Sequence, residues 1–216
     1  MMTKNKSIQW IIKPLVFVSC FLPLLLLGWR GYTGTLSANP ISDITNETGI
    51  WTLRLVLATL AITPARKILK VPDLVKFRRM IGLFAFFYGC LHFMTYIWLD
   101  QFFDWQSIVQ DIPKRPFILV GFTSFSLMIP LAITSTKKMI RRLGGKKWNL
   151  LHRLIYITAV GGVVHYMWKV KVIEAPQIRY AVILGILFSV RFFFAYFPTA
   201  GIKSPRQASV VQLTED

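Results

Sequence analysis

The chain has 216 residues, of which 54% are hydrophobic, and its 26 Lys and Arg against 9 Asp and Glu give a formal net charge of +17. Ordinary soluble domains have about 45–50% apolar residues, and the excess here lies in blocks, so we expect membrane spans rather than one soluble core. The two cysteines, Cys20 and Cys90, lie in apolar runs without a CxxC or CxxCH motif, which excludes a disulfide framework.

Six apolar segments follow one another along the chain, and we interpret each as a membrane-spanning helix. Most have about 19–20 residues, enough to cross a hydrocarbon layer ~30 Å thick at 1.5 Å per residue. The second is the shortest, and we expect it to end near Pro64. The segments cover residues 10–29, 49–64, 80–99, 116–134, 149–168 and 179–197. The predicted fold is therefore all-α, with one six-helix membrane domain over 1–202 and a polar tail over 203–216.

Basic residues concentrate on every second connection between the predicted spans. The N-terminal stretch, the loops at 65–79 and 135–147 and the tail hold seventeen Lys and Arg against three acidic residues, whereas the opposite side holds six against six. By the positive-inside rule we expect both termini to be cytoplasmic. Because topology accounts for the positive charge, we expect contact with the lipid bilayer and no nucleic acid partner.

The three histidines all lie within predicted spans. His92 is ~18 Å from the cytoplasmic end of the third span and His165 ~25 Å from that of the fifth, so the two can meet in the outer half of the membrane. His152 lies near the cytoplasmic face. An ideal helix places His152 and His165 ~140° apart, so both can face the third span only if the helix distorts, for example at Gly161–Gly162.

A histidine inside a span either packs, with a hydrogen bond across the bundle, or has a function. For a pair at matching depth the functional candidates are a metal site, a heme and a proton relay. A compact divalent-metal site would need more ligands, and only Cys90 lies at this depth. Two neutral imidazoles suit a six-coordinate heme iron that carries electrons. Small residues near the histidines leave room for a porphyrin or for close helix packing: Ala85, Gly89, Gly161 and Gly162.

Two stretches of the sequence carry a family resemblance. "RRMIGLFAFFYGCLHFMTYIW" and "KKWNLLHRLIYITAVGGVVHYMW" resemble the ferric reductase-like transmembrane domain. More closely, they resemble the MsrQ (YedZ) family of heme-binding membrane subunits of periplasmic methionine sulfoxide reductase systems. The resemblance covers nearly the whole chain, including its length, the six spans and all three histidines.

The resemblance implies an electron-transfer subunit of the bacterial inner membrane that has no substrate-reducing site of its own. Such proteins take electrons from the quinone pool and pass them through heme b and a flavin mononucleotide (FMN). The acceptor is a periplasmic, molybdopterin-containing catalytic subunit that repairs oxidised methionine in periplasmic proteins. By position, His92 and His165 become axial ligands of one heme, and His152 becomes a candidate for a second heme or a quinol site.

The chain also departs from the wider ferric reductase pattern, in which two hemes lie between four histidines. Arg78 and Arg79 stand fourteen and thirteen residues before His92, where a histidine partner for His152 would be expected. No GxGxxG motif is present, so a membrane-soluble donor such as quinol is favoured over NADPH.

Four arginines are candidates for holding anionic cofactor groups. Arg54 could pair with a heme propionate or extend to the interface. Arg78 and Arg79 could hold a flavin phosphate or be ordinary positive-inside charges, and the same holds for Arg153. Arg191, in the sixth span, is expected to extend toward the inner interface.

Two other functions stay open. The first is a stand-alone transmembrane ferric or cupric reductase with the same heme, and a periplasmic partner protein would distinguish it. The second is a small proton-coupled transporter, which would purify without colour.

Overall fold

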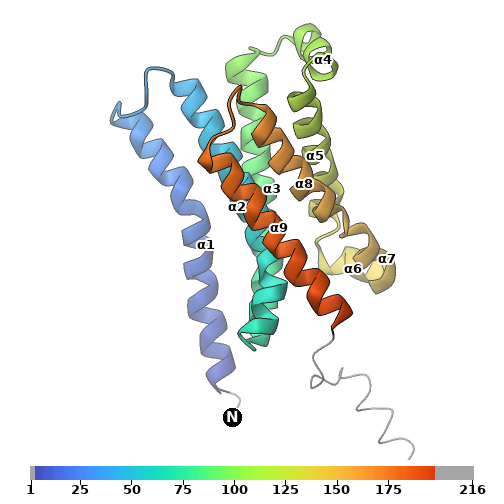
Figure 1. Ribbon diagram of the computed structural model, residues 1–216. Coiled ribbons are helices and arrows are strands. Elements are labelled where there is room, and N and C mark those ends of the chain that lie inside the picture. Colours follow the sequence, from blue (N-terminus) through green and yellow to red (C-terminus); the bar gives the residue numbers. More distant parts are fainter. Residues whose placement is uncertain (1–2, 198–216) are drawn as a thin grey trace, which may run out of the picture.

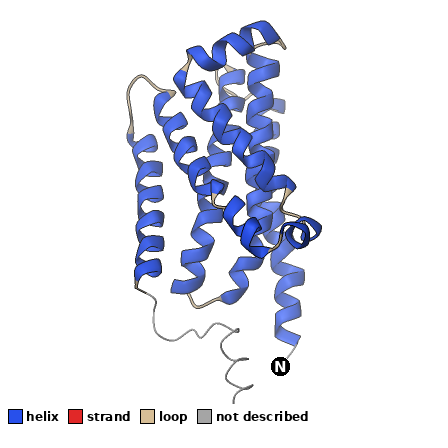
Figure 2. Cartoon of the chain, turned by 90° about the vertical axis from the view of Figure 1, so that its right-hand side faces the viewer, coloured by secondary structure: helices blue, strands red, loops and turns tan. Residues whose placement is uncertain are grey.

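The computed structural model describes residues 3–197, with side chains from residue 11 onward, and the tail predicted for 203–216 lies outside them. Within the described residues every regular element is a helix, as Figures 1 and 2 show. Six of the helical segments described are long and apolar enough to cross a membrane. The predicted all-α fold with six spans is confirmed.

The helices differ from the predicted segments mainly at their ends. In chain order they are α1 (Thr3–Tyr32), α2 (Pro40–Ile68), η1 (Pro72–Leu74), α3 (Val75–Met94), η2 (Thr95–Asp100), α4 (Trp105–Lys114), α5 (Pro116–Ile133), α6 (Lys137–Leu143), α7 (Gly145–Leu151), α8 (Leu154–Trp168) and α9 (Ala175–Tyr196). The end of the bundle with the α1–α2 loop and α4 is called the outer end below, and the end with α6 and α7 the inner end (Figure 1).

Helix α2 is much longer than the predicted segment 49–64. It begins at Pro40, where Asn39 caps it by accepting a hydrogen bond from the Ser42 N–H at 3.1 Å. Polar residues fill its first turns, so the helix extends beyond the apolar run on which the prediction rested. Pro64 lies inside α2 and does not end it, because neighbouring helices can compensate for the missing N–H.

The fifth span is interrupted at its inner part. Helix α7 ends at Leu151 and α8 begins at Leu154, with His152 and Arg153 between them. The distortion expected at Gly161–Gly162 therefore lies at His152 itself. The break removes the fixed 140° relation between His152 and His165, since they no longer share one regular helix.

A short helix crosses the outer end after the third span. Helix α4 is capped by Asp104, whose side chain accepts hydrogen bonds from two N–H groups at 3.1 Å each. Its apolar residues follow the spacing i, i+3, i+4, i+7, which puts them on one face: Trp105, Ile108, Val109 and Ile112. Sequence reasoning missed this helix because it is too short and too polar to resemble a span.

The centre of the bundle is formed by α2, α3, α5 and α8. Helix α2 packs mainly on α3, and α5 mainly on α8. Helix α1 stands at the edge (Figure 1), tied to α3 by Tyr88, whose buried hydroxyl donates to the Cys20 carbonyl at 2.9 Å and accepts from the Leu24 N–H at 3.2 Å. Many apolar side chains on α1 and α9 are exposed, as expected for surfaces that face lipid.

Candidate functional site

A cavity of about 500 Å³ lies between the four central helices. Its deep part is lined by apolar side chains such as Leu53, Val56 and Met128. Its lining continues to polar residues of the outer end, including Asn46 and Arg115. Its volume falls within the range of about 300–1,000 Å³ that is usual for cofactor pockets.

His92 on α3 and His165 on α8 both line this cavity. Their ring centroids are 5.9 Å apart and the ring planes make an angle of 75°. The matching depths of the two residues in the sequence predicted this meeting. The two residues are 73 positions apart in the chain.

A main-chain carbonyl fixes the hydrogen-bonding role of each ring. Nδ1 of His92 lies 2.9 Å from the carbonyl oxygen of Thr45, and Nδ1 of His165 lies 2.6 Å from that of Phe117. A carbonyl oxygen can only accept, so each Nδ1 carries the proton and donates. In the neutral ring this leaves the lone pair on Nε2. A hydrogen bond from the nitrogen that does not bind the metal is typical of metal-ligating histidines.

Each imidazole also lies against a glycine of a facing helix. A Cβ atom added to Gly49 of α2 would stand 2.9 Å from Cε1 of His92, and one added to Gly121 of α5 would stand 2.6 Å from Nδ1 of His165. Both distances are shorter than real Cβ contacts, so only glycine fits without a shift of the ring. Sequence reasoning missed both glycines, although each sits in a span near the depth of the histidine it touches.

The glycines that were predicted to make room have different roles. Gly89 and Gly162 line the cavity. Gly161 instead faces Ser124 so closely that a Cβ atom there would collide with its hydroxyl. It therefore permits close packing of α8 on α5, and Ala85 is fully buried in the core.

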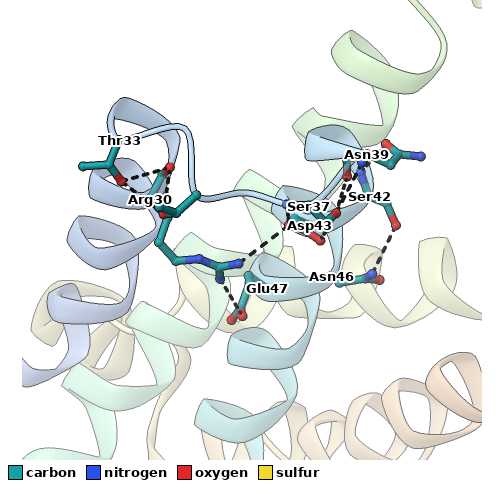
Figure 3. A network of polar contacts seen from close by, with 9 residues as sticks. Arg30, Thr33, Ser37, Asn39, Ser42, Asp43, Asn46 and Glu47 are labelled. Carbon is teal, nitrogen blue, oxygen red and sulfur yellow. Dashed lines mark hydrogen bonds and ion pairs between the residues drawn. The ribbon is translucent and has the colours of Figure 1, made fainter.

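A polar network lies at the outer start of α2 (Figure 3). Thr45 and Gly49 belong to the same first turns of this helix. Arg30 at the end of α1 lies 3.7 Å from the Asp43 carboxylate and 3.6 Å from that of Glu47. Asp43 also accepts hydrogen bonds from the backbone and the hydroxyl of Ser37 at 2.7 and 2.9 Å. Exposed ion pairs contribute little stability, but these contacts link the end of α1 to the first turns of α2.

The donor set and the shape of the cavity fit a b-type heme. An iron bonded at about 2 Å to one nitrogen of each ring would place the ring centres about 6 Å apart, close to the observed separation. Two buried polar atoms on the cavity wall, Tyr96 Oη and Thr158 Oγ1, have no hydrogen-bond partner among the described residues. Those residues contain no group of three or more His, Cys, Asp or Glu that could hold a bare metal ion.

Arg54, the outer arginine candidate, is turned away from this cavity. Its Nε donates to the Tyr180 hydroxyl at 2.8 Å, and its guanidinium stacks 4.7 Å from the Trp51 ring. Arg54 is not among the residues that line the cavity. The structure thus brings it to α9 and not to the histidine pair.

His152 lies apart from the cavity, at the inner end. Its ring stacks on Trp148 with centroids 3.9 Å apart, and its Nε2 lies 3.1 Å from Thr134 Oγ1. The Thr134 hydroxyl gives its own proton to the Pro130 carbonyl at 2.6 Å. It must then accept from His152, so Nε2 of His152 carries the proton and Nδ1 holds the lone pair.

Arginines surround this inner position at different depths. Arg78 is half-buried and close enough for its charge to act on His152 and Arg191, whereas Arg79 and Arg153 are exposed. Arg191 does not simply extend to the interface as expected. It donates to the Tyr156 hydroxyl at 2.7 Å and to the Leu60 carbonyl at 2.5 Å, inside the bundle.

Comparisons with known proteins agree with this arrangement. Residues 48–163 match the family model described as "Ferric reductase like transmembrane component". No solved structure matches the chain.

Several curated relatives match most of the chain and share one name, protein-methionine-sulfoxide reductase heme-binding subunit MsrQ. The relative from Herminiimonas arsenicoxydans is 49% identical over 188 residues, which is 86% of each protein. The one from Rhodospirillum rubrum is 53% identical over 82% of this chain and 85% of its own. The one from Caulobacter vibrioides is 50% identical over 85% and 87%.

The family match covers most of the four central helices but ends at residue 163, two residues before His165, and the relatives cover a larger share of the chain. Together with the six apolar helices, they make this a multi-pass bacterial membrane protein. The chain belongs to the ferric reductase-like transmembrane family and, within it, to the MsrQ heme-binding subunits of protein-methionine-sulfoxide reductases.

Proposed function

We propose that this chain is the b-type cytochrome subunit of a methionine sulfoxide reductase system in the bacterial inner membrane. It takes electrons from quinol and delivers them to a periplasmic, molybdopterin-containing catalytic subunit. The observation that carries the proposal is the pair formed by His92 and His165 on the cavity wall, with both Nδ1 atoms bound to carbonyls and both Nε2 atoms left to ligate. The names of the relatives support the heme and the reductase partner.

The residues of the outer site prepare it for one-electron chemistry. A bound heme b supplies a reversible iron couple there. The carbonyls of Thr45 and Phe117 orient the two rings and increase their basicity as ligands. The apolar wall of the deep cavity disfavours water. Gly49 and Gly121 lie against the rings of His92 and His165 and leave the space that the rings occupy.

Reduction of methionine sulfoxide is assigned to the partner. The connections at the outer end are short, at residues 33–39, 101–115 and 169–174, and α4 lies within the second of them. A large oxidised protein would need a broader surface than these loops provide. The chain is therefore proposed to carry electrons and not to reduce the final substrate.

The inner site around His152 is proposed to receive the electrons. Because Thr134 holds the Nε2–H of His152, the free Nδ1 lone pair is available to accept a quinol proton. Ligation of a second heme by Nδ1 would require another ligand, and the charged group near His152 is Arg78. An FMN phosphate would find basic partners in Arg78, Arg79 and Arg153.

Pigment analysis tests the proposal directly. The full chain, purified in detergent, should contain heme b with a low-spin spectrum, and quinol should reduce it. A colourless protein would favour the transporter alternative. A reduced protein that passes electrons to ferric or cupric chelates but not to the reductase subunit would favour the stand-alone reductase.

Both termini are proposed to be cytoplasmic, which makes the inner end of the bundle the cytoplasmic end. Single cysteines placed at Thr33 and Lys146, in a Cys20→Ala, Cys90→Ala background, can be labelled in spheroplasts with a membrane-impermeant maleimide. The cysteine at position 33 should react and the one at 146 should not. The reverse pattern would invert the proposed topology.

A further inference from the structure

A polar residue follows each histidine by one helical turn toward the outer end. Tyr96 comes four residues after His92, and Lys169 comes four residues after His165. Four residues of α-helix advance about 6 Å and return to nearly the same face. Both residues line the cavity, so the wall outside the histidine pair is polar at Lys169, directly after the end of α8, and on the π-helical stretch η2 that continues α3.

The hydroxyl of Tyr96 is buried and has no hydrogen-bond partner among the described residues. A buried hydroxyl without a partner is unfavourable, which points to a group that the structure does not contain. Asp100, Asp111 and Arg115 all lie close enough for their charges to act on Tyr96, so its hydroxyl stands in a charged environment at the outer end.

Two cations face the same part of the cavity. Lys169 Nζ donates to Asn46 Oδ1, and Arg115 Nε lies 3.4 Å from the Asp111 carboxylate. Lys169, Asn46 and Arg115 are all lining residues. Asp100 also lines the cavity there, where its carboxylate accepts from Gln101 at 3.2 Å. The outer part of the cavity can therefore receive anionic groups, with Asp100 as the one opposing charge among the lining residues described.

We propose that Tyr96, Lys169 and Arg115 bind the two carboxylates of the heme and so fix its orientation with the carboxylate edge outward. This inference rests on the proposed heme site. Both carboxylates leave the same edge of heme b, so one end of the cavity must accept them together. The inward orientation would press two charges against Leu53, Val56 and Met128, where their desolvation would be unfavourable.

Removing single groups and esterifying the heme test this assignment. Full-length apoprotein is reconstituted in nanodiscs with heme b or with heme dimethyl ester, and pigment loss to an excess of a heme-scavenging globin is timed. The variants are Tyr96→Phe, Lys169→Gln and Arg115→Gln. The matched controls at the same end are Tyr32→Phe, Lys171→Gln and Arg179→Gln, none of which lines the cavity.

Each test variant should lose heme b about tenfold faster than its control, because a hydrogen bond to a charged group is removed. The native protein should lose the ester about tenfold faster than heme b, and the variants should not accelerate loss of the ester further. The midpoint potential should fall in Lys169→Gln and Arg115→Gln, since less positive charge remains near the iron.

Thermal unfolding of the apoprotein distinguishes a loss of heme contacts from a loss of protein stability. Tyr96→Phe should leave it unchanged, because the removed hydroxyl has no partner in the apoprotein. Equal retention of heme b and its ester by the native protein, or variants that match their controls, would overturn this inference alone. A native protein that takes up neither pigment would overturn the proposed function as well.

Discussion

The outer histidine pair and the inner His152 engage opposite ring nitrogens. His92 and His165 each donate from Nδ1 to a main-chain carbonyl, which leaves Nε2 free to ligate. His152 donates from Nε2 to a threonine hydroxyl, which leaves Nδ1 free beside a stacked tryptophan. Nε2 is the outermost ring atom and can reach into a cavity, whereas Nδ1 lies close to the main chain. The same residue type is thus proposed to ligate iron at one end of the bundle and to exchange a proton at the other.

Removal of an outer histidine should have the largest effect. His92→Ala or His165→Ala should abolish the low-spin heme b spectrum, because each variant lacks one of the two proposed axial ligands. Absorption and electron paramagnetic resonance spectra of the purified variants provide the measurement, with His152→Ala as the control that keeps the signal. A normal bis-histidine spectrum in both variants would show that His92 and His165 are not the heme ligands.

Replacement of the inner histidine should leave the outer spectrum intact and slow its reduction. His152→Ala should lower the rate of heme reduction by quinol about 100-fold, the usual size of a lost general base. Dithionite should still reduce the heme fully. Stopped-flow traces with both reductants make the measurement, and an unchanged rate with quinol would return His152 to a packing role.

Filling the space behind an outer ring should have an intermediate effect. Gly121→Ala places a Cβ atom where the His165 ring now lies, at a cost of about 1–3 kcal/mol in overpacking. Heme retention should weaken about tenfold or more, with conversion of part of the heme to a high-spin form. Gly185→Ala is the matched control, since its Cβ would meet nothing within 4 Å. Equal retention in the two variants would show that the glycine contact is unimportant.

The smallest effect is expected from the hydroxyl that holds His152. Thr134→Val keeps the shape of the side chain but removes the acceptor for Nε2, a loss of about 1 kcal/mol. Reduction by quinol should slow about fivefold, well short of the effect of His152→Ala. Thr123→Val on the same helix is the control, because that hydroxyl donates to the Leu119 carbonyl. If Thr134→Val equals His152→Ala, the hydroxyl itself takes part in proton transfer.

Much of this arrangement could be predicted from the sequence, because hydropathy decides the number of spans, whereas the direction that the charges indicate stays a prediction. Helical rise then places His92 and His165 at similar depths, and the structure brings them together. The break at His152 was not predictable in the same way, since it depends on tertiary contacts with Trp148 and Thr134. Periodicity predicts which residues share a helix face, but it does not predict which neighbouring helix packs closely against that face.

For that reason the sequence did not identify Gly49 and Gly121 as residues of the site, because glycine is common in membrane helices. Their importance comes from the side chain of another helix that lies against them. Arg54 shows the opposite case. Its depth suggested a cofactor, but rotation about α2 turns it toward Tyr180.

The use of main-chain atoms to hold both outer rings has a consequence for how this protein can diverge. Thr45 contributes its carbonyl oxygen to His92, and Gly49 and Gly121 contribute only the lack of a side chain. Phe117 contributes its carbonyl oxygen to His165 and also a ring whose centroid lies 6.1 Å from that of the imidazole. Substitution of Thr45 therefore leaves the hydrogen bond to His92 in place, provided that the helix keeps its course, whereas substitution of Phe117 also removes a ring contact with His165. Substitutions should therefore be tolerated broadly at Thr45, whose carbonyl accepts from His92, and narrowly at the two glycines. A saturation library would show this difference without any spectroscopy.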